Sequence, residues 1–170
     1  MQDPTFAGSV VFITEHSEDG ALGLIINQPL DLAMNGLYER LDLPLPDRRL
    51  AQKPVLKGGP VNHSHGYVLH KPVGNYISTV AVSDEVGVTK SRDVLEAVSR
   101  GEGPEQIVVC LGYAGWSAGQ LEEELGANAW LTVPASNELI FDTPMDERFH
   151  RAFGLLGINP AFLSASAGHA

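Results

Sequence analysis

The stretch Ile107-Val108-Val109-Cys110-Leu111 decides the fold class of this 170-residue chain. All of its residues are apolar, without the alternation of a half-exposed strand, which is typical of a strand covered on both faces. Turns, further strands and helical patterns surround it. The chain is therefore expected to form a sheet with helices packed against it, in one mixed domain of helices and strands.

The residues before this stretch predict short strands joined by turns. Residues 10–14 and 22–26 flank a polar turn and are expected to pair as a hairpin. Leu37 and Leu41 lie four residues apart, which indicates a weakly amphipathic helix that ends before the prolines at positions 44 and 46. Further strands are predicted at residues 55–56, 66–69 and 76–82.

Two helices are predicted, one before the central stretch and one after it. Residues 91–100 form the first, with Ser91 as its N-cap and Gly101 at its end. Residues 118–125 form the second, which Gly126 ends. A strand lies between them, so the order of elements is helix, strand, helix.

The last part of the chain predicts two strands and a helix. Residues 130–133 and 139–141 are expected to be strands on either side of a turn. Thr143 is placed to cap a helix that has Pro144 in its first position and ends at Gly157. No repeat or linker interrupts the pattern, and residues 1–170 are predicted to be a single domain.

The composition limits the classes of partner. Eleven Lys and Arg stand against 21 Asp and Glu, a formal net charge of −10, whereas nucleic acids and anionic membranes are bound largely through cations. We expect no direct nucleic-acid binding and no membrane binding. Cys110 is the single cysteine, so no internal disulfide forms, and its apolar surroundings predict a buried thiol. With no secretory signal at Met1-Gln2-Asp3-Pro4, a cytoplasmic protein is expected.

The sharpest chemical pattern is Gly115-Trp116-Ser117-Ala118-Gly119. It matches the G-x-S-x-G elbow, in which a tight turn between a strand and a helix exposes a nucleophilic serine. Ser117 followed by Gln120 is also a capping box, which explains a serine there without catalysis. The capping interpretation is preferred, and a serine hydrolase is the alternative. Its acids and bases would come from Asp142, Asp146, His150 and His169.

Two further patterns are compatible with small ligands. His63 and His65 would share one face of a strand, but no carboxylate or cysteine lies at a supporting spacing, so no metal site is expected. Gly58-Gly59-Pro60-Val61 permits close backbone approach and exposed N–H groups that could hold an anion. A structural turn is the preferred interpretation, and no cofactor is predicted.

Several segments of the chain together resemble the AlgH/YqgE family of bacterial proteins. They follow one another in the family's order over essentially the whole chain, so the chain is identified as a member. The matching segments are Asp3-Pro4 with residues 8–11, then residues 15–16, 20–27, 58–61, 91–95, 112–116, 119–122, 128–131 and 142–144.

The resemblance implies an α+β fold with a branched sheet, mixed or antiparallel, partly closed into a small barrel and flanked by helices. Members are often labelled transcriptional regulators, and no catalytic residues are established for the family. They usually begin with an apolar strand before the segment that matches Asp3-Pro4; without that strand a sheet edge would be exposed.

A non-enzymatic regulatory or binding protein, acting on a protein or small-molecule partner, is therefore the preferred hypothesis. An anion-binding or metal-binding protein and the serine hydrolase are its alternatives. The polar turns and one aromatic residue are the expected contact region for a ligand, and these residues are Asn27, Gly58, Gly59, Pro60 and Trp116.

Overall fold

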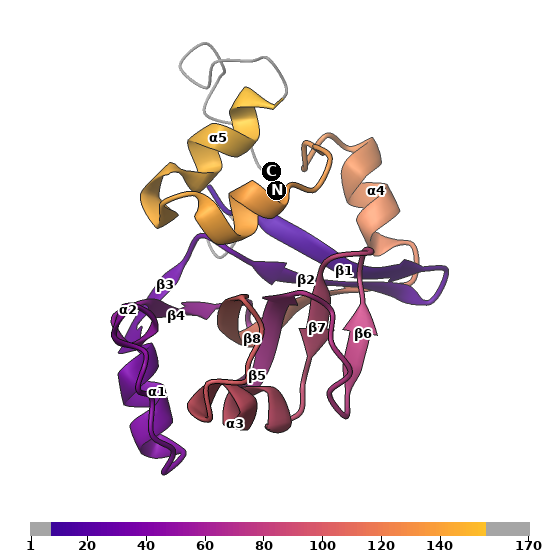
Figure 1. The fold of residues 1–170 in the computed structure, drawn as a ribbon. Helices are drawn as coiled ribbons and strands as arrows, with labels where there is room; N and C mark the ends of the chain where they lie inside the picture. Colours follow the sequence, from indigo (N-terminus) through magenta and orange to yellow (C-terminus); the bar gives the residue numbers. More distant parts are fainter. Residues whose placement is uncertain (1–7, 156–170) are drawn as a thin grey trace.

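Strand β8 (Gln106–Ser117) lies at the centre of the sheet in this computed structural model, which describes residues 8–155 (Figure 1). It pairs antiparallel with β5 (Val61–Lys71) and, further along, antiparallel with β2 (Gly20–Ile25). A short parallel ladder joins it to β4 (Pro54–Lys57). The predicted branched, mixed sheet is confirmed.

The other strands extend this sheet on both sides of β8. Strand β1 (Val11–Ser17) pairs with β2, which confirms the predicted hairpin. The path through the sheet runs β1-β2-β8-β5-β7-β6, and β3 pairs with β4 beside it. The remaining bounds are β3 (Pro29–Ala33), β6 (Thr79–Ala81) and β7 (Gly87–Thr89). Figure 1 shows the sheet curling into a half-barrel, with β1 and β2 running across the ends of the other strands.

Helices cover the curled sheet from two sides (Figure 1). In this view α1, α2 and α3 gather at one end of the molecule, and α4 and α5 lie beyond β1 and β2. The helical bounds are α1 (Met34–Arg40), α2 (Arg48–Ala51), α3 (Asp93–Ser99), α4 (Gln120–Gly126), the π-helical turn η1 (Glu138–Asp142), the 3-10 turn η2 (Met145–Glu147) and α5 (Arg148–Gly154). None of these helices has the length and apolar character needed to cross a bilayer.

Alternate residues of β8 enter the cores on its two faces. Val108 and Cys110 belong to a cluster with η1 and α5, whereas Ile107, Val109 and Leu111 pack with α1 and α3. Cys110 has no exposed surface and Val109 keeps only 2%. The continuous apolar run is explained, because each face of a strand takes every second residue.

The structure does not contain the strands predicted at residues 130–133 and 139–141. The first segment has no regular structure, and the second lies in η1. Trp130 is nevertheless buried against Trp116, and Leu139 and Ile140 enter the core beside α5. Both predictions are wrong for one reason: an apolar run of three or four residues carries no periodicity that separates a strand from a helical turn.

The predicted helix starts are displaced by a few residues. Ser91 does not cap α3; its hydroxyl donates to the carboxylate of Asp93. The hydroxyl of Thr143 donates to the carbonyl of Glu138 and so closes η1 instead of opening a helix. The predicted helix end at Gly157 and the Asp3-Pro4 segment lie outside the described residues. Only residues 79–81 of the predicted strand 76–82 form a strand, β6.

A buried histidine ties β5 to β7. His70 has no exposed surface, and its Nδ1 lies 2.9 Å from the carbonyl of Pro72. Because a carbonyl can only accept, Nδ1 donates and the neutral ring accepts at Nε2 from the hydroxyl of Thr89, 2.6 Å away. The hydroxyl of Thr79 can then donate to Thr89, 2.8 Å away. Burial lowers the pKa of His70, so the neutral ring is the folded form.

We expect the stabilisation from His70 to be lost as the pH falls. The unfolded chain takes up a proton at about pH 6.5, whereas the folded ring resists it, so the contribution is complete above pH 6.5 and declines below it. Phe at position 70 should cost about 1–3 kcal/mol at neutral pH. Urea unfolding at pH 7.5 and pH 5.5 should show the wild type and His70→Phe converging at the lower pH. An equal difference at both pH values would contradict this, and His63→Phe at an exposed position of the same strand is the control.

Candidate functional site

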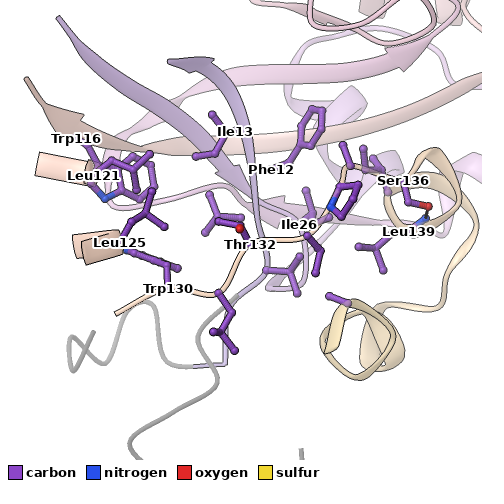
Figure 2. Close-up of a pocket in the computed structure, with 18 residues that line it drawn as sticks. Phe12, Ile13, Ile26, Trp116, Leu121, Leu125, Trp130, Thr132, Ser136 and Leu139 are labelled. Atoms are coloured by element: carbon purple, nitrogen blue, oxygen red, sulfur yellow. Dashed lines mark hydrogen bonds between the residues drawn. The ribbon is translucent and has the colours of Figure 1, made fainter. Parts of the chain in front are cut away.

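An apolar cavity of about 210 Å³ lies between the β1–β2 hairpin and the helices next to it. Figure 2 shows side chains from β1, α4, the segment after α4 and η1 pointing into this space. Most of the lining is apolar, and residues 131–136 form part of the wall. The principal apolar walls come from Phe12, Ile26, Leu121, Leu125, Leu139 and Ala152.

Two tryptophans form the end of the cavity near α4. The rings of Trp116 and Trp130 meet edge to face, with their centroids 5.9 Å apart. Both indole N–H groups donate to the same carboxylate oxygen, Oε1 of Glu124, at 3.0 Å and 2.8 Å. The other oxygen of Glu124 accepts from the amide of Gln120 at 3.0 Å. One carboxylate therefore fixes both rings, and the two indole N–H groups need no partner from a ligand.

Of the predicted contact residues, only Trp116 lines this cavity. The amide of Asn27 is used within the protein: it accepts from the backbone N–H of Val10 at 2.8 Å and donates to the carbonyl of Gly8 at 2.9 Å. Val10 in turn forms part of the cavity wall. Asn27 thus holds the wall in place from behind, without facing the space.

The predicted glycine turn lies where β4 gives way to β2 along one edge of β8. Gly58 donates to the carbonyl of Leu111 at 2.9 Å and accepts from the N–H of Ile25 at 2.7 Å. A Cβ on Gly59 would overlap the backbone of Tyr113. Gly58 and Gly59 are buried, whereas Pro60 is exposed. Close backbone approach accounts for both glycines, and the N–H of Gly58 is already bonded within the protein.

Ser117 lies on a regular strand and not on a nucleophile elbow. Trp116 and Ser117 still pair with β2, and the left-handed residue that follows is Gly119, with φ 76°. Both the hydroxyl and the backbone N–H of Ser117 donate to Oε1 of Gln120, at 3.2 Å and 2.9 Å. The glutamine half of the predicted capping box is therefore present, although Gly119 occupies the N-cap position itself.

The acids and bases of the hydrolase alternative do not converge on Ser117. Asp142 accepts a hydrogen bond from Gln106, at the opposite end of β8. His150 is exposed on α5, and His169 lies outside the described residues. Within residues 8–155 no imidazole hydrogen-bonds the hydroxyl of Ser117, which a Ser–His pair requires.

The histidines do not gather either. His63 and His65 are both exposed on β5, and His16 pairs with Glu122 at 2.6 Å. Across the described part of the chain, no group of three His, Cys, Asp or Glu side chains is placed to hold a metal ion.

Glu124 and Trp130 were missed by the sequence analysis. A usable signal was present, because Trp116 and Trp130 are the only tryptophans in the chain and a run of glutamates lies between them. An indole N–H needs an acceptor when it is buried. Which of the three glutamates supplies it depends on how α4 turns, and this is visible only in the fold.

Comparison with known proteins places the chain among relatives of similar length. The profile of the AlgH-like family matches residues 1–161. A UPF0301 protein of Ralstonia nicotianae is 55% identical over all of this chain and 90% of its own length. The solution structure of the AlgH protein from Pseudomonas aeruginosa matches with a TM-score of 0.81 and 46% identity, over 100% of this chain and 90% of that one. The crystal structure of DIP2367 from Corynebacterium diphtheriae shares the fold, with a TM-score of 0.64 and 21% identity over 81% of this chain and 72% of that one.

Adding a methyl group at Gly59 is expected to destabilise the protein by about 1–3 kcal/mol or more, because the Cβ would overlap the backbone of β8. Gly154→Ala at the end of α5 is the matched control: nothing lies near its Cβ, and alanine should stabilise the protein by about 0.4–1 kcal/mol. Chemical unfolding of both variants checks this. If Gly59→Ala were as stable as the wild type, the close approach of the glycine turn to β8 would be refuted.

Proposed function

The chain belongs to the AlgH-like family, and we propose that it is a non-enzymatic binding protein. Its ligand is a small apolar molecule held in the cavity beside Trp116 and Trp130. The observation that carries this proposal is the cavity itself, whose walls are mostly apolar and whose two indole N–H groups are bonded to Glu124.

The size of the cavity favours a small ligand. An apolar cavity of about 150 Å³ stays dry and binds benzene, whereas pockets for drug-sized molecules begin at about 300 Å³. The cavity of this protein, at about 210 Å³, lies between the two. A one-ring or two-ring aromatic molecule, or a short aliphatic one, fits this range.

Recognition would depend on shape and apolar contact. Trp116 and Trp130 keep only 6% and 7% of their surface exposed, so their positions are set before a ligand binds. Rigid aromatic side chains lose little conformational freedom on binding, which favours them as contact surfaces. Both indole N–H groups already donate to Glu124, so a polar ligand would gain no hydrogen bond from the indole edges.

A regulatory role follows most simply from ligand or protein binding in the cytoplasm. The net charge of −10 opposes direct contact with nucleic acid. Cys110, the single cysteine, is buried, as suits a protein without a disulfide. The hydroxyl of Ser117 donates to Gln120, and within residues 8–155 no imidazole hydrogen-bonds it, which supports a role without catalysis.

Bromobenzene tests the proposal through the chain's own fluorescence. Both tryptophans line the cavity, so a brominated ligand in it should quench their emission by heavy-atom contact. We expect saturable quenching with a dissociation constant of roughly 0.1–1 mM, equivalent to about −4 to −5.5 kcal/mol. Trp116→Phe and Trp130→Phe should each leave a tryptophan that is still quenched.

A cavity-filling variant provides the control. Ala152→Leu places a larger side chain in the cavity and should abolish the saturable quenching, while Ala81→Leu at an exposed position on β6 should not. Quenching that rises linearly with bromobenzene in every variant would be collisional and would reject the proposed site.

A further inference from the structure

Arg148 is a buried cation to which residues 8–155 supply no acidic partner. It is the first residue of α5 and keeps only 5% of its surface exposed. No ion pair within residues 8–155 includes it. Buried charges are normally paired, because leaving one without a counter-charge in a low dielectric is costly. An anion bound beside Arg148 would supply the missing counter-charge.

The guanidinium has hydrogen-bond donors to spare. Its Nε donates to the carbonyl of Thr143 at 3.0 Å, and its Nη1 donates to the carbonyl of Ile26. An arginine has five N–H groups, one on Nε and two on each terminal nitrogen. One N–H on Nη1 and both on Nη2 thus remain without a hydrogen bond to the described chain. The two N–H groups on Nη2 are therefore available to donate to a carboxylate, and hydrogen bonds between a guanidinium and a carboxylate are among the strong ones.

The neighbours of Arg148 do not supply the missing charge. Burial raises the pKa of Cys110, the nearby titratable group, to about 12, so its thiol is neutral. Asp142 lines the same cavity, but it is exposed, accepts a hydrogen bond from Gln106 and makes no ion pair with Arg148.

Arg148 lines a cavity of about 280 Å³ between α1, β4, β8 and the η1–η2 segment. Most of its walls are apolar, and they include Met34, Leu56 and Met145. Lys53, which is exposed, adds a second positive charge to the lining. We infer that this cavity is a binding site for an organic carboxylate, with the carboxylate on the free N–H groups of Arg148 and the apolar body against these walls.

The apolar walls favour an organic acid over an inorganic anion. Phosphate carries up to two charges and would have to shed its water against carbon, whereas an organic carboxylate has one charge and an apolar body. A planar guanidinium also matches a planar carboxylate in geometry. The site is separate from the cavity beside Trp116 and Trp130, so either can exist without the other.

Thermal unfolding with matched probes tests this inference. Benzoate should raise the melting temperature of the wild-type protein in a saturable manner, because a ligand that binds only the folded state stabilises it. Both probes are compared in the Ala152→Leu variant, in which the cavity beside Trp116 and Trp130 is filled. In that variant benzyl alcohol, which has the same ring without the charge, should produce no comparable shift. Equal shifts from both probes would overturn the role of the charge, and a shift from inorganic phosphate but not from benzoate would overturn the choice of an organic acid.

Variants of α5 locate the site. Arg148→Met keeps an unbranched apolar stem and removes the guanidinium charge, and should weaken benzoate binding about tenfold or more. Arg151→Met, on the exposed face of the same helix, should bind benzoate as the wild type does. Unchanged affinity in Arg148→Met would reject the site.

A wild-type readout keeps the inference testable even if Arg148→Met fails to fold. The Nε–H signal of Arg148 in ¹H–¹⁵N spectra, assigned with Arg148→Lys, should move with benzoate along the same binding curve as the thermal shift. If that signal stays in place while benzoate stabilises the protein, the anion binds elsewhere and the inference fails.

Discussion

The structure depends on β8, a single strand that pairs with three others. Strand β5 occupies one edge of β8, so β4 and β2 must share the other, one after the other along its length. The change from β4 to β2 falls at Gly58, whose N–H and carbonyl bridge Leu111 and Ile25. Buried backbone groups must find partners, and the glycine turn allows this without a gap. The branch in the sheet is the result.

This arrangement places the two candidate sites toward different ends of β8. Trp116 near its end lines the apolar cavity, whereas residues 107–109 near its start line the cavity that holds Arg148. Helix α5 contributes to both: Arg148 and Ala152 lie four residues apart, with one residue in each cavity lining. A neutral cavity and a cationic one are thus built against the same short helix, with different chemistry because only one contains a charge.

Long periodic segments could be predicted from the sequence, and short apolar ones could not. The hairpin β1–β2, helices α1, α3 and α4, and the core strand β8 all follow from spacing and turn residues. Residues 130–133 and 139–141 were wrongly predicted as strands, because Trp130, Leu139 and Ile140 are buried by contacts with other parts of the chain and not by their own pattern. Ser117 shows that a local motif can also mislead. The residues around it match the G-x-S-x-G motif, but the pairing of β8 with β2 continues through Ser117, so no nucleophile elbow forms.

The sequence by itself determined the α+β class, the family, the acidic character and the burial of Cys110, because these depend on composition, local spacing and whole-chain similarity. Only the tertiary structure decided which residues form a site. Trp116 and Trp130 both bond Glu124 because α4 folds back against β8. Arg148 meets the carbonyl of Ile26, 122 positions away. The contact between Arg148 and Ile26 leaves no local pattern, because the two residues are distant in sequence and only the fold brings them together.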